Sequence, residues 1–181
     1  MIRILNVFIL AVLLGGCASF YEVKANKPVI PYVKPVVIEH NFDISGRFNV
    51  KQPYQSSYGN FTWTKQGDSE VLNFQTPIGQ TIAQIVIESG IPTLNKDGDT
   101  YTGDDFNKIM KTNLGFVMPM SNLHYWMQGV PVSDTPITAN LNDGFVQLGW
   151  KVEYLQWQDK NHPQIIQCSK DNLVIKLLIE W

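Results

Sequence analysis

The stretch "LNFQTPIGQTIAQI", residues 72–85, predicts a β-hairpin with an unusual tip. Two segments with strand character, 71–76 and 81–87, flank the turn Pro77-Ile78-Gly79-Gln80. Proline and glycine favour a tight turn at this point. A turn tip normally carries polar residues because it faces water, yet here an isoleucine stands between them. A single exposed aliphatic residue is common on protein surfaces, so the meaning of Ile78 depends on the rest of the chain.

The hairpin belongs to a longer β pattern that begins near residue 41. Apolar and polar residues alternate over 42–50, and further strands are predicted at 57–65, 92–95, 100–102, 138–141, 144–148, 150–157, 164–168 and 173–179. Two short helices interrupt them, one after Thr102 or Asp104 with Gly115 as its stop, the other from Ser121 to Gly129. About ten strands with short connections indicate an antiparallel meander, either a curved sheet or an open barrel.

The N-terminus has the features of a lipoprotein export signal. Residues 1–16 carry Arg3 and then an apolar run that is too short to cross a bilayer as a permanent helix. The sequence Leu14-Gly15-Gly16-Cys17 resembles the bacterial lipobox, which implies cleavage before Cys17 and its lipidation. An ordinary signal peptide with an incidental cysteine is the alternative. No aspartate follows Cys17, so the outer membrane is the expected destination.

Residues 17–40 are expected to form the lipid-bearing cysteine and its tether. Pro28, Pro31 and Pro35 recur in this stretch and favour extended chain over helix or sheet. The folded domain is therefore predicted to cover residues 41–181. The chain has 181 residues, which suits one domain with a substantial core.

The sequence offers little support for catalysis, metal binding or nucleic-acid binding. The formal net charge is -2, and the basic residues do not cluster, which excludes a nucleic-acid footprint. His40, His124 and His162 lack a histidine or cysteine at ligand spacing, and no nucleophile elbow or phosphate loop occurs. Cys168 is expected to be a buried, inert thiol. We therefore expect no enzyme activity, no cofactor and no metal.

Large apolar side chains are numerous for a small β domain. They either fill the core or line an apolar cavity enclosed by the curved sheet and closed by the helices. The candidate cavity residues are Phe61, Trp63, Phe74, Ile85, Trp126, Met127, Trp150 and Tyr154.

These segments together resemble the LolB family of outer-membrane lipoprotein receptors. The resemblance rests on "SGRFNV", "GNFTWTK", "TPIGQT", "YTGDDFNKIMKTNLGFVMPMSNLHYWMQGVP" and "GWKVEY", and it covers roughly residues 41–181 together with the lipobox. It implies an open or incomplete antiparallel β-barrel with an apolar cavity for acyl chains, capped by two or three short helices. The match implies that Trp63, Trp126 and Trp150 line that cavity or lie beside it.

The same resemblance implies a function for the hairpin tip. The family carries a protruding apolar residue in a Pro-hydrophobic-Gly motif, which here is Pro77-Ile78-Gly79, with isoleucine in place of the usual leucine. The expected function is to accept lipoproteins from the periplasmic carrier LolA and insert them into the outer membrane. The chain would act as a monomer on the periplasmic face, anchored through Cys17. A structural or assembly lipoprotein, whose β domain docks to an envelope complex, is the alternative.

Overall fold

The computed structural model describes residues 38–181. The predicted signal segment 1–16, Cys17 and most of the predicted tether lie outside the described residues. The strands are β1 (Phe42–Gln52), β2 (Gln55–Gln66), β3 (Ser69–Gln75), β4 (Thr81–Glu88), β5 (Ile91–Lys96), β6 (Asp99–Thr102), β7 (Ile137–Leu141), β8 (Gly144–Gln147), β9 (Trp150–Trp157), β10 (Pro163–Lys170) and β11 (Leu173–Glu180). The helices are α2 (Phe106–Leu114) and α3 (Met120–Trp126).

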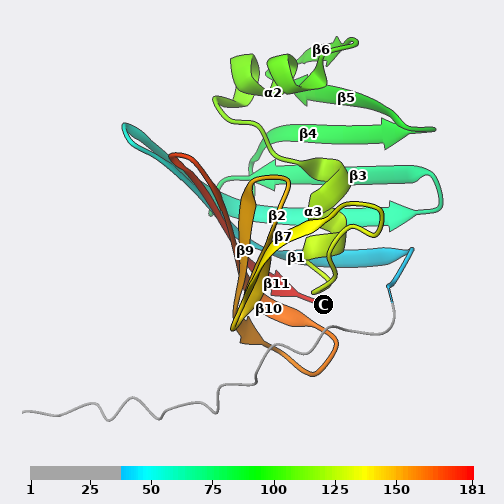
Figure 1. Cartoon of the computed structure of the whole chain (residues 1–181). Helices are drawn as coiled ribbons and strands as arrows, with labels where there is room; N and C mark the ends of the chain where they lie inside the picture. Colours follow the sequence, from blue (N-terminus) through cyan, green and yellow to red (C-terminus); the bar gives the residue numbers. More distant parts are fainter. Residues whose placement is uncertain (1–37) are drawn as a thin grey trace, which may run out of the picture.

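All eleven strands form one curved antiparallel sheet that is not closed (Figure 1). Their order is β6-β5-β4-β3-β2-β1-β11-β10-β9-β8-β7, so the first and last strands pair at the centre of the sheet. The two edge strands, β6 and β7, are consecutive in the sequence but are separated by the segment that contains both helices. Helix α2 contacts β5 and β6, and the chain then runs through α3 to β7, so the two edge strands do not pair. The predicted open antiparallel architecture is confirmed.

The core lies on the concave face and follows the alternation seen in the sequence. In β1, Phe42, Ile44, Phe48 and Val50 are buried, and the residues between them are more exposed. Phe48 meets Phe74 of β3 edge to face, with ring centroids 5.3 Å apart. Close packing also explains one glycine, because a Cβ on Gly46 would lie 1.9 Å from the carbonyl oxygen of Leu178.

The two helices begin and end differently. Helix α2 begins after Asp105, whose Oδ1 accepts a hydrogen bond from the Lys108 N–H at 3.0 Å, and it ends at Gly115 in the left-handed conformation. Gly115 was predicted as this stop, whereas the expected cap at Thr102 or Asp104 is one to three residues early. Helix α3 begins after Pro119 with no side-chain cap, so the predicted start at Ser121 is two residues late.

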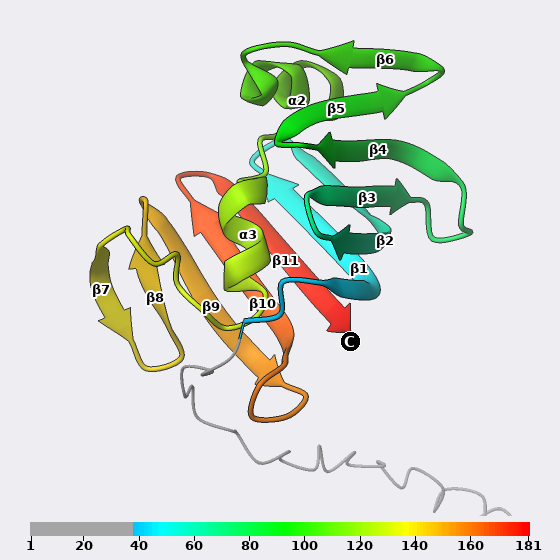
Figure 2. The ribbon, with the colours of Figure 1, turned by 90° about the vertical axis from the view of Figure 1, so that its right-hand side faces the viewer.

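Helix α3 lies inside the curve of the sheet and is held there at its C-terminal end (Figure 2). The fully buried Gln147 of β8 accepts hydrogen bonds from Trp126 Nε1 at 3.0 Å and from the Val132 N–H at 2.9 Å. Its amide nitrogen donates to the carbonyl oxygens of Val132 and Thr135 at 2.9 and 2.8 Å. Tyr154 Oη donates to the Trp126 carbonyl oxygen at 2.9 Å. The loop after α3 is thus fixed to the β7–β9 half of the sheet.

Candidate functional site: a pocket beneath the helices and an exposed loop

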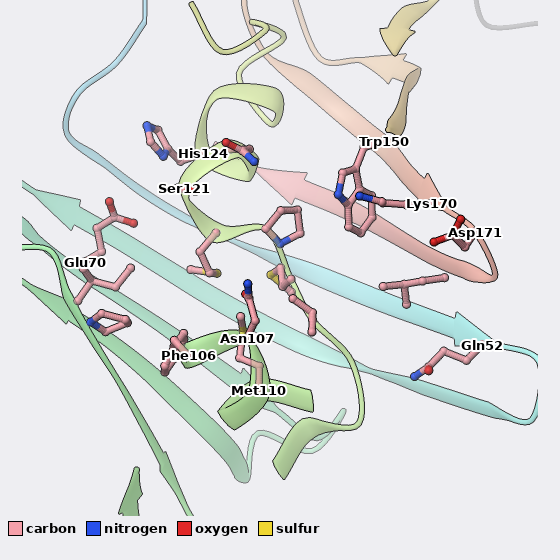
Figure 3. A pocket seen from close by; sticks show the side chains of 18 of the residues that line it. Gln52, Glu70, Phe106, Asn107, Met110, Ser121, His124, Trp150, Lys170 and Asp171 are labelled. Carbon is pink, nitrogen blue, oxygen red and sulfur yellow. The ribbon is translucent and has the colours of Figure 1, made fainter. Parts of the chain in front are cut away.

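A pocket of about 820 Å³ lies between the concave face and the segment that contains both helices (Figure 3). Its apolar wall includes Ile87, Phe106, Met110, Met118, Met120 and Trp150. Small-molecule sites are typically clefts of about 300–1,000 Å³ lined mainly by apolar groups. In size and chemistry, this pocket suits a ligand with a long apolar part.

Methionine supplies much of this wall. Four of the five methionines in the chain fall between residues 110 and 127, and three of them line the pocket. A methionine side chain is flexible and polarisable, so it adapts to ligands of different shapes. Met110, Met118 and Met120 were not among the predicted cavity residues, although the concentration of methionine in one short segment was a usable signal.

The eight candidate cavity residues are all buried, with exposed fractions of 7% or less. Trp150 is the member of this set that lines the large pocket. Phe61, Trp63 and Phe74 instead border a space of about 10 Å³, together with Met118 and Leu123. Ile85, Trp126, Met127 and Tyr154 belong to the same continuous apolar core.

The enclosed apolar cavity expected from the sequence is therefore not shown within residues 38–181. The reason lies in the helical segment, because the side chains of Met118 and Leu123 fill the space next to the aromatic residues of β2 and β3. The larger space lies beside these side chains and is bordered by exposed turn residues such as Asp171 and Asn172.

The loop between β3 and β4 holds Ile78 away from the sheet, with 82% of the side chain exposed. The Gly79 N–H donates to the Thr76 carbonyl oxygen at 2.9 Å, and the Thr76 N–H donates to the Gln80 carbonyl oxygen at 2.8 Å. Gly79 has φ of 87°, a conformation that favours glycine. These contacts fix a short loop that extends beyond the ends of its strands (Figure 2), with Ile78 between Pro77 and Gly79.

One charged pair lies on the concave face, where alternation places apolar residues. Lys65 Nζ is 2.8 Å from Glu70 Oε1, and the two side chains are 17% and 11% exposed. Glu70 and His124 line the large pocket. Burial lowers the pKa of His124, so its imidazole is neutral at neutral pH. We did not single out this pair from the sequence, although Glu70 alternates with Leu72 and Phe74 on the inward face.

The chain that enters β1 contacts the end of α3. The Glu39 N–H donates to Gln128 Oε1 at 2.7 Å, and Gln128 Nε2 donates back to the Glu39 carbonyl oxygen at 3.1 Å. His162 lies between Asp159 and Glu39, at 2.8 and 3.3 Å from their carboxylate oxygens. Burial opposes protonation of His162, but the hydrogen bonds and charges of these carboxylates outweigh it and raise its pKa. The hydrogen bond from His162 lowers the pKa of Asp159.

The remaining candidates for chemistry are structural in character. Cys168 is fully buried in β10, and burial raises the pKa of its thiol, which disfavours the reactive thiolate. Within residues 38–181, no group of three His, Cys, Asp or Glu side chains is arranged to hold a metal ion. No helix in that part of the chain is both long and apolar enough to cross a membrane.

Comparison with known proteins identifies a family for this arrangement. The family model described as outer membrane lipoprotein LolB matches residues 40–181. An outer-membrane lipoprotein LolB of Chromobacterium violaceum is 25% identical over 182 residues, which cover 99% of this chain and 98% of the relative. The LolB of Neisseria meningitidis serogroup A is 30% identical over 92% of this chain and 83% of its own length. The chain therefore belongs to the LolB family of outer-membrane lipoproteins.

Proposed function

We propose that this protein accepts lipoproteins from a LolA-like periplasmic carrier by binding their acyl chains, and that it then inserts them into the outer membrane. The pocket of about 820 Å³ beneath the helices is the observation that carries the proposal. Each methylene group moved out of water contributes about 0.8 kcal/mol, so an acyl chain needs a continuous apolar surface during transfer. The methionine-lined wall supplies such a surface.

In this proposal transfer runs from weaker to stronger apolar hosts. The chain holds acyl groups more tightly than the carrier does, and the bilayer holds them more tightly still. No covalent step is needed, so the protein acts as a receptor and not as an enzyme. Lipidated Cys17 keeps it on the periplasmic face of the outer membrane, and residues 17–40 form the tether. Ile78, held outward by Pro77 and Gly79, enters the bilayer at delivery.

Acyl binding is tested with the unlipidated mature chain, residues 17–181 carrying Cys17→Ala. Every described strand and helix lies within residues 42–180, so removal of residues 1–16 leaves the fold intact. A fluorescent fatty acid should bind saturably and be displaced by a triacylated lipopeptide. Val117→Asp places a charge on the half-buried pocket wall and should weaken binding at least tenfold.

Leu155→Asp is the matched control, because Leu155 is 49% exposed and does not line the pocket. This variant should bind the fluorescent fatty acid like the parent. Absence of displaceable binding in the parent would contradict the receptor function and favour a structural role in an envelope complex.

A further inference from the structure

The ion pair between Lys65 and Glu70 sits in the interior of the sheet, at positions that normally carry apolar residues. Lys65 follows Trp63 on the inward face of β2, and Glu70 precedes Leu72 on the inward face of β3. Lys65 Nζ also donates to the Gly67 carbonyl oxygen at 3.0 Å. The pair is therefore ordered and largely removed from water.

Two common reasons for an inward-pointing ion pair, protection of a sheet edge and a gain in folding stability, do not explain this placement. Inward-pointing charges protect the edges of sheets, but β2 and β3 are interior strands with partners on both sides. An ion pair removed from water gains little stability, because desolvation offsets the attraction, and an apolar pair of similar volume is often as stable. A contribution to ligand binding would explain why Lys65 and Glu70 occupy these inward positions.

One further nitrogen atom at this end of the core has unused hydrogen-bonding capacity, and a histidine lies nearby. Trp63 Nε1 is buried without a hydrogen-bond partner among the described residues, whereas the His124 imidazole has a backbone hydrogen bond with Met120. Trp63 is 1% exposed and lies on the same face of β2 as Lys65. His124 lies on α3, close enough to Glu70 and Lys65 for both charges to act on its imidazole. Buried polar atoms in native proteins usually have partners, so such atoms call for an explanation.

Of these residues, Glu70 and His124 line the large pocket, whereas Lys65 and Trp63 do not. Glu70 and His124 are on the side opposite Trp150, with Met110 and Phe106 along the wall between them, and Lys170 and Asp171 border the pocket at the Trp150 end (Figure 3). A second space of about 390 Å³ shares Glu70 and Ile87 with the pocket and is also lined by Lys65. The polar surface therefore continues past the end of the apolar wall.

We propose that the pocket binds its ligand in one direction, with the polar group at Lys65, Glu70 and His124 and the acyl chain running toward Trp150. This inference rests on the proposed acyl-binding function. Lys65 donates hydrogen bonds to carbonyl or phosphate oxygens, and Glu70 accepts one from an amide or ammonium group. The ligand is thus an acyl chain attached to a polar group with both donors and acceptors. An acylated lipoprotein N-terminus and a phospholipid share this chemistry.

The direction is measured by quenching of tryptophan fluorescence in the unlipidated mature chain. The probes are lysophospholipids with a nitroxide either next to the headgroup or near the methyl end of the chain. The difference between the parent and Trp150→Phe isolates the signal of Trp150. The methyl-end probe should quench that signal several-fold more than the headgroup-end probe does. The reverse order, or equal quenching by both probes, would overturn the proposed direction.

A double variant tests the polar site separately. Lys65→Met with Glu70→Leu replaces the ion pair by apolar side chains, which is expected to preserve folding. Lysophospholipid and triacylated lipopeptide should each bind at least tenfold more weakly to this variant, whereas an uncharged apolar dye should bind as to the parent. Lys151→Met with Glu153→Leu, a pair at 2.6 Å on β9 with more exposed side chains, is the matched control and should change neither affinity.

The outcomes separate this inference from the proposed function. If the parent binds neither lipid nor dye, the acyl-binding function itself fails. If the double variant binds lipopeptide and lysophospholipid like the parent, acyl binding stands and the polar site is refuted. Competition then identifies the source of the ligand. If lipopeptide displaces the probe at a lower concentration than phospholipid vesicles do, the ligand is a lipoprotein. If the vesicles displace it at the lower concentration, the ligand is a membrane lipid.

Discussion

Ile78 allows the delivery step to be separated from the binding step by one substitution. Its side chain is 82% exposed at the tip of a loop with its own hydrogen bonds. Ile78→Glu should therefore change the free energy of unfolding by less than about 0.5 kcal/mol, as is usual for surface positions. Receipt of a lipoprotein from the carrier should also be nearly unchanged, because Ile78 does not line the pocket.

The effect on delivery follows from the apolar surface that Ile78 presents. Full transfer of an isoleucine side chain from water is worth about 1.5–3 kcal/mol, and scaling by the exposed fraction leaves about 1.2–2.5 kcal/mol. With about 1.4 kcal/mol for each factor of ten, delivery to vesicles should slow by roughly 7- to 60-fold. The charge of glutamate adds a further cost, so this range is a lower bound.

The assay follows lipoprotein that moves from the variant to vesicles made of outer-membrane phospholipids. Ile91→Glu is the matched control, because Ile91 is also an exposed isoleucine, at 64%, and begins β5 just after the turn at the opposite end of β4. The two ends of β4 are roughly 24 Å apart. Ile91→Glu should deliver like the parent. Equal delivery by Ile78→Glu and the parent, or equal loss in both variants, would refute a specific role for the tip.

Three further predictions concern stability and reactivity. Gln147→Leu leaves four polar groups near α3 without their partner, so urea unfolding should show a loss of about 2–4 kcal/mol, whereas the exposed Gln66→Leu should match the parent; similar midpoints for both would show that the network does not hold α3. The carboxylate partners of His162 raise its pKa, so its stabilising charge is present below about pH 6.5 and is lost as pH rises through the raised value. Unfolding free energy measured from about pH 6 to about pH 9 should fall less steeply in His162→Gln, and parallel curves would contradict this linkage. A thiol reagent should modify Cys168 only after urea unfolds the mature Cys17→Ala chain, and rapid labelling of the folded chain would show that β10 opens.

The local signals in the sequence predicted most of the fold. Period-two alternation located the strands, Pro77 and Gly79 located the turn between β3 and β4, and Gly115 located the end of α2. The first helix cap was misplaced because threonine and two aspartates in a row all have capping side chains. The start of α3 was missed because Pro119 begins it without any side-chain cap.

Long-range features were beyond local signals. The central pairing of β1 with β11 joins residues more than a hundred positions apart, as in the pair Ser45 and Glu180. Burial of the aromatic residues was foreseeable from the sequence. Whether Met118 fills the space beside Trp63 or leaves it open depends on three-dimensional packing. The inward charge of Glu70 was visible in the sequence as a break in alternation. Its proximity to His124 could be seen only in the folded structure.

The most direct test of the account is to locate a bound acyl chain. A photoreactive fatty acid is crosslinked to the unlipidated mature chain, and the labelled residues are identified by mass spectrometry. Labelling should saturate, should be displaced by a triacylated lipopeptide, and should fall on the pocket wall, above all at Met118, Met120 and Trp150. Labels on the convex face of the sheet, or labelling that neither saturates nor is displaced, would contradict acyl-chain binding in this pocket.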